Sequence, residues 1–256
     1  MAVCGQMMNP AEFAHIAEAE RTFWWYRGMR RILFRALEPL LAGRQIRRVL
    51  EAGCGTGYFA QVLERERGWT VYPSDIAANG LAFARGYGLK RISQADLSAL
   101  PFREGSFDLV TAMDVLVHFA PGEEIRPIRE MARVLSRGGL MVLRAGALNV
   151  LRSRHSGFVG ERQRFTRGRL TGALRDCGIR VLRSTYANTL LLPVALAKFR
   201  VWEPLRRPAP ESGVRPVAGW LDRTLYTFLW AESVWVGRGF DLPAGQSLIL
   251  VGEKIA

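Results

Sequence analysis

Three glycines at alternate positions follow a short apolar run near residue 50, and they constrain the fold more than any other feature of the chain. The run Val49–Ala52 contains the acid Glu51 and leads into Gly53-x-Gly55-x-Gly57, after which residues 58–67 are amphipathic. This order predicts a strand, a tight turn and a helix. Glycines let the backbone turn sharply and leave no side chain between it and a ligand. The turn is therefore a candidate ligand site.

Two classes of cofactor use such a turn. Dinucleotide-binding proteins have the pattern G-x-G-x-x-G, with pyrophosphate at the helix N-terminus. In this chain the third glycine of that pattern is replaced by Tyr58. Glu51 would also repel a pyrophosphate, whereas it suits a ligand that carries an ammonium group. An NAD-dependent reductase stays open as an alternative, but these residues count against it.

Further motifs follow in order along the next ninety residues. They are a strand-like run that ends in an acid (Trp69–Asp75), an acid and a leucine (Asp96-Leu97), a second apolar run and its loop (Ser106–His118), and a helix, glycine turn and strand (Glu130–Leu143). With the glycine turn, they resemble the ordered motifs of the class I S-adenosylmethionine (SAM) methyltransferases, the small-molecule branch in particular. The resemblance covers residues 46–145 densely.

The resemblance implies that SAM is the cofactor and S-adenosylhomocysteine its product. By this analogy Asp75 would accept hydrogen bonds from the ribose hydroxyls, Asp96 would accept from the adenine amino group, Leu97 would cover the ring, and Asp114 would lie near the sulfonium. The cofactor-binding residues that it implies are Tyr26, Arg30, Glu51, Gly53, Gly55, Gly57, Asp75, Ile76, Asp96, Leu97, Met113 and Asp114.

The N-terminal helices of such methyltransferases fold over the cofactor. Tyr26 and Arg30 lie in an expected helix over residues 27–41 or just before it, close to a run of four aromatic residues at 23–26. They could reach the methionine carboxylate of SAM, and a purely structural role is equally open for each.

His118 is the candidate catalytic residue. The methyl group of SAM is already activated, so proximity and orientation supply most of the acceleration, and a base matters only if the acceptor is a hydroxyl. His118 follows the fourth expected strand, next to where the methyl group would lie; a packed or cofactor-lining role is the alternative. His155, in an arginine-rich stretch, is a second candidate, and His15 is expected on a helix surface.

The sequence gives no reason to expect a metal site. The three cysteines Cys4, Cys54 and Cys177 are scattered without C-x-x-C spacing, which argues for a reducing cytoplasm and against a zinc site or a disulfide framework. The N-terminus carries acids early and has no apolar signal core. A cytoplasmic enzyme is therefore expected.

The favoured function is transfer of a methyl group to a small-molecule acceptor, as O-methylation of an anionic, sugar-derived or lipid-like metabolite. Arg152, Arg154, Arg162 and Arg164 suggest the anionic acceptor, with a solvated loop as the alternative. RNA methylation and a non-catalytic SAM-binding module are the rival functions. Against RNA methylation, the residues after the fourth expected strand are 113–116, Met-Asp-Val-Leu, and not Asn/Asp-Pro-Pro-Tyr/Phe.

The formal net charge of +13 is compatible with nucleic acid, an anionic substrate or a membrane surface. Arginine dominates that charge, as it does in chains from arginine-rich genomes, and no aromatic RNA-binding motif is present. A nucleic-acid partner is therefore disfavoured, peripheral membrane contact stays open, and the oligomeric state is left undetermined.

The expected fold class is α/β, a Rossmann-like, doubly wound sheet of seven strands, mostly parallel with an antiparallel last strand. The division expected is an N-terminal helical cap (1–45), a SAM-binding core (46–186), a helical insert that forms a substrate cap (187–245) and the last core strand (246–256). A dimer face or a membrane contact is the alternative for the insert. The expected strands are 46–51, 69–74, 89–93, 107–113, 138–145, 179–186 and 247–253, and the expected helices are 27–41, 57–67, 76–86, 122–136, 166–177, 189–201 and 217–236.

Overall fold

A computed structural model describes residues 8–206, 212–214 and 217–255, so Cys4 lies outside the described part of the chain. The described strands form one seven-stranded sheet in the order β3-β2-β1-β4-β5-β7-β6. Only β7 runs antiparallel to its two neighbours among them, which confirms the expected fold class. The strands are β1 (Arg48–Ala52), β2 (Thr70–Asp75), β3 (Ser93–Gln94), β4 (Phe107–Met113), β5 (Leu135–Gly146), β6 (Ile179–Ala187) and β7 (Ser247–Lys254).

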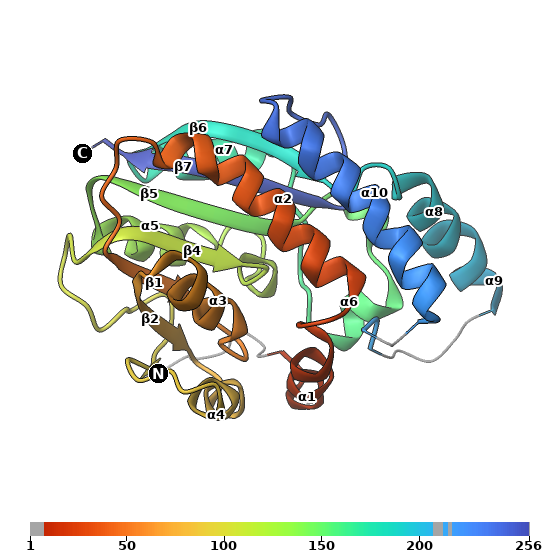
Figure 1. Cartoon of the computed structure of the whole chain (residues 1–256), viewed down its shortest axis with the longest axis horizontal. Coiled ribbons are helices and arrows are strands. Elements are labelled where there is room, and N and C mark those ends of the chain that lie inside the picture. Colours follow the sequence, from red (N-terminus) through yellow and green to blue (C-terminus); the bar gives the residue numbers. More distant parts are fainter. Residues whose placement is uncertain (1–7, 207–211, 215–216, 256) are drawn as a thin grey trace.

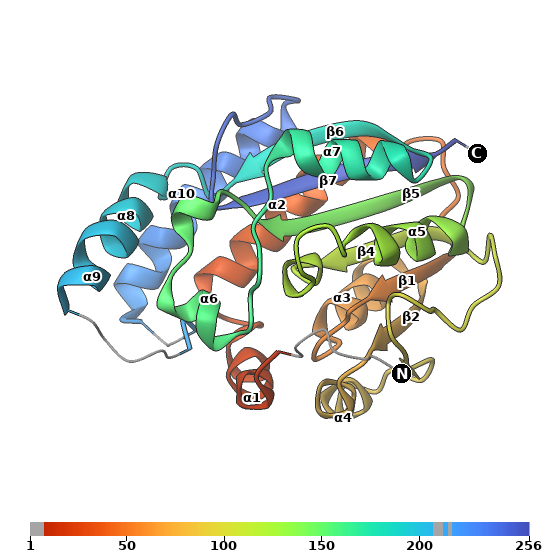
Figure 2. The same cartoon turned by 180° about the vertical axis from the view of Figure 1, so that it is seen from behind.

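Helices cover both faces of the sheet. Helices α2 (Trp24–Leu41), α3 (Tyr58–Arg67) and α10 (Gly219–Gly237) lie in front of it in Figure 1. Helices α5 (Ile125–Val134) and α7 (Arg167–Asp176) cover the other face, which Figure 2 brings to the front. The sheet is therefore the middle of three layers.

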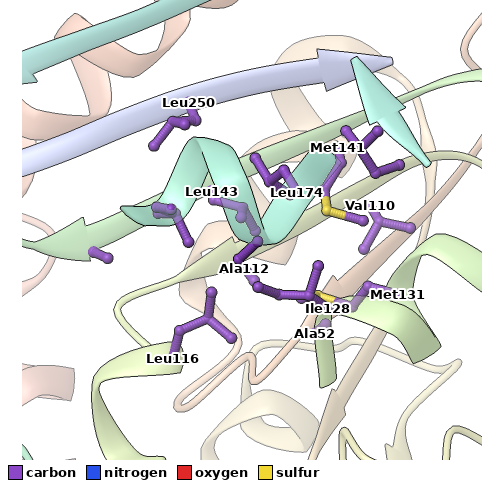
Figure 3. Close-up of a cluster of buried hydrophobic side chains, with 14 of the residues drawn as sticks. Ala52, Val110, Ala112, Leu116, Ile128, Met131, Met141, Leu143, Leu174 and Leu250 are labelled. Atoms are coloured by element: carbon purple, nitrogen blue, oxygen red, sulfur yellow. The ribbon is translucent and has the colours of Figure 1, made fainter. Parts of the chain in front are cut away.

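The two cores follow from the alternation of side chains along each strand. On β4, Leu109 points to the face of α2 and α3, whereas Val110 points to the face of α5. Figure 3 shows the second core, where Ile128 and Met131 of α5 meet the strand residues. Burial on both faces explains why the strand sequences are nearly continuous apolar runs.

The glycine turn after β1 lies where the strand order reverses. From β1 the chain proceeds to β2 on one side and later to β4 on the other. In open α/β sheets this switch point, at the carboxyl ends of the parallel strands, is where ligands bind. The topology therefore places the turn and the acids at the ends of the neighbouring strands along one edge.

Helix α2 begins three residues earlier than expected, at Trp24, and takes in the aromatic run. Its N-cap residue, Phe23, offers no side-chain cap. The cap comes instead from Asp222 of α10, whose Oδ1 accepts a 2.9 Å hydrogen bond from the Trp24 N–H. Arg27 donates to the other oxygen of Asp222 at 2.6 Å. A cap supplied from far along the chain satisfies the orphan N–H groups at the start of the helix.

Helix α10 packs directly along α2, as Figure 1 shows. The approach is so close that a Cβ built on Gly28 would lie 2.3 Å from Leu229 Cδ1. Glu232 of α10 is buried and accepts hydrogen bonds of 2.7 Å from the backbone N–H groups of Asn188, Thr189 and Leu190. This part of the 187–245 segment therefore belongs to the helical layer of the core.

The expected regular helix over 189–201 is wrong, because the helical segment starts later and contains a π-helical turn. The chain forms α8 (Leu192–Ala197), a π-helical turn (Lys198–Trp202) and α9 (Glu203–Arg206). Glu203 is buried and accepts a 3.1 Å hydrogen bond from the Arg154 N–H. This bond ties the segment from α8 to α9 to α6 (Arg154–Phe158). Tertiary contacts of this kind override the local periodicity.

Two other boundaries differ from the expected ones. The expected helix over 122–136 ends at Val134, because Leu135 already pairs with Phe107 and starts β5 ahead of the glycines. The expected strand over 89–93 is reduced to the two residues of β3, which pair only with the end of β2. The remaining described α-helices are α1 (Pro10–Ala19) and α4 (Ala78–Gly86).

Candidate cofactor and active site

A cavity of about 670 Å³ lies at the carboxyl ends of the strands, around the glycine turn. Its walls come from α1 and α2, from the turn, from the loops after β2 and β4, and from the π-helical turn of the insert. This volume is within the range of sites that enclose a small molecule or cofactor.

Eleven of the twelve sequence-predicted cofactor residues line this cavity, and so does His118. Those that line it are Tyr26, Arg30, Glu51, Gly53, Gly55, Asp75, Ile76, Asp96, Leu97, Met113 and Asp114. Gly57 does not. A Cβ on Gly57 would lie 2.6 Å from the Ala84 Cβ, so this glycine permits close packing of α4 on the turn. The binding roles of the other eleven remain predictions.

The glycine turn is held by the acid of the next strand. Gly55 N–H donates to Asp75 Oδ2 at 2.8 Å, and Ala77 N–H donates to Asp75 Oδ1 at 2.8 Å. Burial raises the pKa of the Asp75 carboxyl above its usual value, and these hydrogen bonds oppose that rise. Gly55 has a φ of +56°, and a Cβ there would meet nothing within 4 Å. The turn thus presents bare backbone to the cavity.

Glu51 is a buried carboxyl with one oxygen that lacks a partner. Its side chain is 2 % exposed, and Oε2 has no hydrogen-bond partner in the described part of the chain. Burial raises the pKa of Glu51 well above its usual value, and the nearby carboxyls of Glu20 and Asp75 raise it further. An unpaired carboxylate is costly in such surroundings. A ligand cation beside Glu51 would remove that cost, which fits an ammonium group.

Asp96 lies on the loop after β3. Its Oδ1 accepts a 2.8 Å hydrogen bond from the Ser98 N–H, which fixes the carboxyl at the cavity wall. Leu97 beside it is buried and contributes to the core below. The pair therefore offers a polar acceptor and an apolar surface next to each other.

Glu20 is a wall residue that sequence reasoning missed. It lies between α1 and α2 and accepts hydrogen bonds from Thr56 Oγ1 at 2.6 Å and from the Tyr87 hydroxyl at 2.8 Å. Burial raises the pKa of Glu20 to about 7. The residue ties the N-terminal helices to the glycine turn. No local motif marks it, because both of its partners lie far along the chain.

Tyr26 and Arg30 reach the cavity from α2. The Tyr26 ring packs edge-on against Trp25, with ring centroids 5.1 Å apart, and burial raises its pKa. The guanidinium of Arg30 lies 5.5 Å from the centre of the Tyr58 ring. Both side chains thus line the cavity, and their contact with the methionine end of SAM remains a prediction.

Asp114 is paired with a cation that the sequence did not reveal. Arg144 Nη2 lies 2.6 Å from Asp114 Oδ2, and the same guanidinium stacks 4.9 Å from the Trp25 ring centre. Asp114 also has the left-handed backbone conformation, with a φ of 57°. Its negative charge is therefore balanced by Arg144, and its place near the sulfonium of SAM remains a prediction.

His118 ends a short 3-10 helix, Leu116–His118, after β4. Its Nδ1 lies 3.2 Å from the Gly160 carbonyl oxygen. A carbonyl only accepts, so Nδ1 carries the hydrogen and donates. In the neutral ring this leaves the lone pair on Nε2. The geometry therefore provides a histidine at the cavity wall whose second nitrogen can take up a proton.

The other two histidines differ in place. His155 also lines the cavity, and its Nδ1 accepts a 2.9 Å hydrogen bond from the Gly213 N–H. His15 lies on α1 beside Glu12 and is absent from the cavity wall.

The four arginines of the loop do not form a basic wall in the cavity. Only Arg164 of the four lines it, and its guanidinium is engaged by Glu161 at 2.7 Å. Arg152 donates to the Glu161 carbonyl at 3.0 Å, and Arg162 lies 3.8 Å from Glu123. The structure therefore gives little support to an anionic acceptor held by this loop.

Two further searches concern the described residues only. None of their His, Cys, Asp and Glu side chains gather in threes in an arrangement that could hold a metal ion. Among the described helices, none combines the length and the apolar character needed to cross a bilayer.

Residues 50–143 match the methyltransferase domain family. This span runs from β1 through β5 and holds the glycine turn, Asp75, Asp96 and His118. This span is a methyltransferase domain. The methyltransferase domain covers the cofactor side of the cavity, whereas α1, α2 and the insert lie outside the matched residues.

Curated relatives agree with the domain and differ in their named substrates. A ubiquinone biosynthesis O-methyltransferase of Paracidovorax citrulli is 32 % identical over 146 residues, 52 % of this chain and 60 % of its own length. A protein of Mus musculus named probable tRNA methyltransferase 9B is 34 % identical over 101 residues, 39 % of this chain and 22 % of its own length. The chain thus spans well under two thirds of the curated relatives it matches.

A solved structure shows the same fold over the whole chain. Haemonchus contortus phosphoethanolamine N-methyltransferase 2, in complex with phosphomonomethylethanolamine and S-adenosylhomocysteine, superposes with a TM-score of 0.60 at 15 % identity. The match covers 100 % of this chain and 61 % of that chain. At this identity the likeness concerns the fold alone.

Proposed function

We propose that the protein transfers the methyl group of SAM to a hydroxyl oxygen of a small-molecule acceptor. The observation that carries this proposal is the buried, unpartnered Oε2 of Glu51 at the wall of a cavity that Asp75, Asp96 and His118 also line. A buried carboxylate oxygen without a partner is costly, so its presence beside a cavity points to a cationic ligand group.

The side chains of the wall suit the parts of SAM one by one. Glu51 would pair with the ammonium group, Asp75 would accept from the ribose hydroxyls, and Asp96 would accept from the adenine amino group. Bare backbone at Gly55 lets the ligand lie against the turn. Bound SAM supplies a methyl group that is already activated by the sulfonium.

The chain's own contribution to the reaction is orientation and proton removal. His118 donates through Nδ1 to Gly160, which fixes the ring and leaves Nε2 to accept the proton of an acceptor hydroxyl. Helices α1 and α2 close the cavity from above, held to the turn by Glu20. Closure excludes water and favours transfer to the bound acceptor.

A partly apolar acceptor fits the remaining wall. The wall beyond the methyltransferase domain includes Val159 and Phe199, and Arg164 there is already paired with Glu161. The relative named for ubiquinone biosynthesis is an O-methyltransferase, which supports a hydroxyl on a lipophilic molecule.

Calorimetry tests the cofactor, and methyl transfer tests the acceptor. The protein is titrated separately with SAM and with NADH, and binding of SAM alone is expected. It is then incubated with tritiated-methyl SAM and, in separate reactions, with a lipid extract, a polar metabolite extract and total RNA. Label in the lipid extract supports the proposal, label in RNA identifies an RNA methyltransferase, and SAM binding without transfer to any pool identifies a non-catalytic binding module.

A further inference from the structure

Large apolar side chains are exposed mainly on one part of the molecule. Of the twelve exposed large apolar residues in the described chain, ten lie between 190 and 240. They are Leu190, Val194, Val201, Trp202, Leu205, Trp220, Phe228, Trp230, Trp235 and Phe240. We call these ten residues the apolar face. Exposed large apolar side chains concentrated in one part of a chain point to an interaction surface.

The rod of α8, the π-helical turn and α9 carries the first half of the apolar face. Val194, Val201 and Leu205 of this rod are exposed, and Leu190 is exposed in the turn just before it. Val194 and Leu205 are 63 % and 78 % exposed. Phe199 of the same rod lines the cavity. One side of this rod thus faces the cavity and the other faces solvent.

Helix α10 carries the second half. Its buried residues, Leu229 and Val236, face α2. Trp220 lies on the opposite side of the helix and is 71 % exposed, whereas Phe228 and Trp235 are exposed on its flank. Figures 1 and 2 show α8, α9 and the start of α10 together at one end of the molecule, from which α10 runs back along α2. The aromatic side chains are therefore not needed for the core that α10 helps to form.

The charges on these segments are unevenly placed. Each described acid between residues 190 and 241 is buried or ion-paired: Glu203 and Glu232 are buried, Asp222 pairs with Arg27, and Asp241 pairs with Arg183. The basic side chains of the same segments are exposed, and they are Lys198, Arg200, Arg223 and Arg238. The surface thus combines tryptophan and aliphatic side chains with positive charge.

We propose that the apolar face docks on the surface of an anionic lipid bilayer. Interfacial segments combine tryptophan and leucine on one face with basic residues beside it, and each basic side chain near an anionic surface adds attraction. A second copy is a poorer occupant, because it would bring another chain of net charge +13 carrying the same basic residues. A bilayer of opposite charge satisfies both the apolar and the basic side chains.

The docking has a consequence for the acceptor, which rests on the proposed function. The rod that carries Val194 and Leu205 also places Lys198 and Phe199 at the cavity wall. A lipophilic acceptor dissolved in the bilayer would then lie next to the site. The docked enzyme would take its acceptor from the membrane.

Vesicle flotation tests the docking without reference to catalysis. The full chain is mixed with phosphatidylglycerol vesicles and with phosphatidylcholine vesicles, and flotation with the anionic vesicles alone is expected. The double variant Val194→Asp/Leu205→Asp should bind at least tenfold more weakly, while the matched control Ile255→Asp, at an exposed apolar residue outside the face, should bind as the wild type does.

Two measurements on the same samples keep the outcomes apart. Circular dichroism and SAM titration verify that the double variant is folded. Failure of the wild type to bind SAM would count against the proposed function, whereas the flotation result would still test the docking. The docking is overturned if the wild type does not float with anionic vesicles or if the double variant floats as well as the wild type. Sedimentation equilibrium that shows a dimer lost in the double variant, without flotation, would assign the face to a second copy instead.

Discussion

The carboxylate of Asp75 accepts a 2.8 Å hydrogen bond from the backbone N–H of Gly55, so the end of β2 holds the glycine turn that follows β1. The same carboxylate lines the cavity. One acid therefore fixes the shape of the turn and faces the ligand. Substitution of Asp75 should therefore weaken cofactor binding both directly and through the shape of the turn.

The Asp75→Ala variant should bind SAM at least about tenfold more weakly, because charge-assisted hydrogen bonds to the ribose and the anchor of the turn are both lost. Calorimetric titration measures the loss. Asp108→Ala is the matched control: Asp108 accepts from the N–H groups of Arg47 and Arg48 at the other end of the sheet and is absent from the cavity wall. Equal affinity in the Asp75 variant would refute the ribose assignment.

The His118→Asn variant should lower kcat by about 10²- to 10⁴-fold, the usual contribution of a general base. The dissociation constant of SAM should stay within about twofold, since His118 is assigned to the acceptor side. Turnover and calorimetry on the same protein give both values. His15→Asn, on the surface of α1, serves as the control. A loss of SAM affinity equal to the loss of kcat would make His118 a cofactor contact rather than a base.

Glu20 should make stability depend on pH. Burial raises its folded-state pKa from 4.5 to about 7. The contribution of Glu20 to the free energy of unfolding is therefore fully present below pH 4.5 and is lost as pH rises through 7. The difference in free energy of unfolding between the wild type and Glu20→Gln should shift by on the order of 3 kcal/mol across this window, with the variant relatively more stable at the higher pH.

Urea unfolding of the two proteins at pH 5, 6, 7 and 8 measures this shift. Other carboxyl groups titrate in the same range, so the comparison with the Glu20→Gln variant isolates the contribution of Glu20. Parallel stability curves for the two proteins would show that Glu20 does not titrate with folding.

The glycines at 55 and 57 should respond differently to alanine. Gly57 has a φ of +79°, and an added Cβ would clash with Ala84, so Gly57→Ala should lose more than about 2 kcal/mol of stability. Gly55→Ala carries the backbone strain of about 1–2 kcal/mol without a clash. Its methyl group should weaken SAM binding instead. Thermal unfolding and SAM titration of both variants measure these effects. A larger stability loss in Gly55→Ala, or a larger loss of SAM affinity in Gly57→Ala, would contradict the assignment.

Deleting residues 187–245 should abolish SAM binding as well as turnover. The segment includes α10, which packs on α2, and α2 carries Tyr26 and Arg30 at the cavity wall. From the sequence alone a cap that could be removed without loss of cofactor binding was expected.

Two point variants on α10 test whether its buried side packs into the core. Leu229→Ala should cost about 2–5 kcal/mol, as for other buried leucines. The exposed Trp230→Ala should change stability by less than about 0.5 kcal/mol. Urea unfolding of the two variants measures both values, and equal effects would contradict the assignment of α10 to the core.

The cofactor side of the site could be predicted from the sequence because its signals are local. The turn at residues 53–57 needs glycine at positive φ, and strands that alternate with helices place their carboxyl ends along one edge. Glu51 and Asp75 therefore meet at the cavity by topology alone, wherever the helices that cover them lie. The fold class follows from the same alternation.

The closing wall of the site was decided by the tertiary structure. Asp222 caps α2, Glu20 meets Thr56, and Arg144 balances Asp114, each across a long stretch of chain. Such pairs leave no periodic trace, because a hydrogen bond depends on where two distant segments come to lie and not on the residues next to either partner. The π-helical turn between α8 and α9 likewise leaves no trace in the local pattern, and Glu203, which follows it, accepts from the N–H of the distant Arg154.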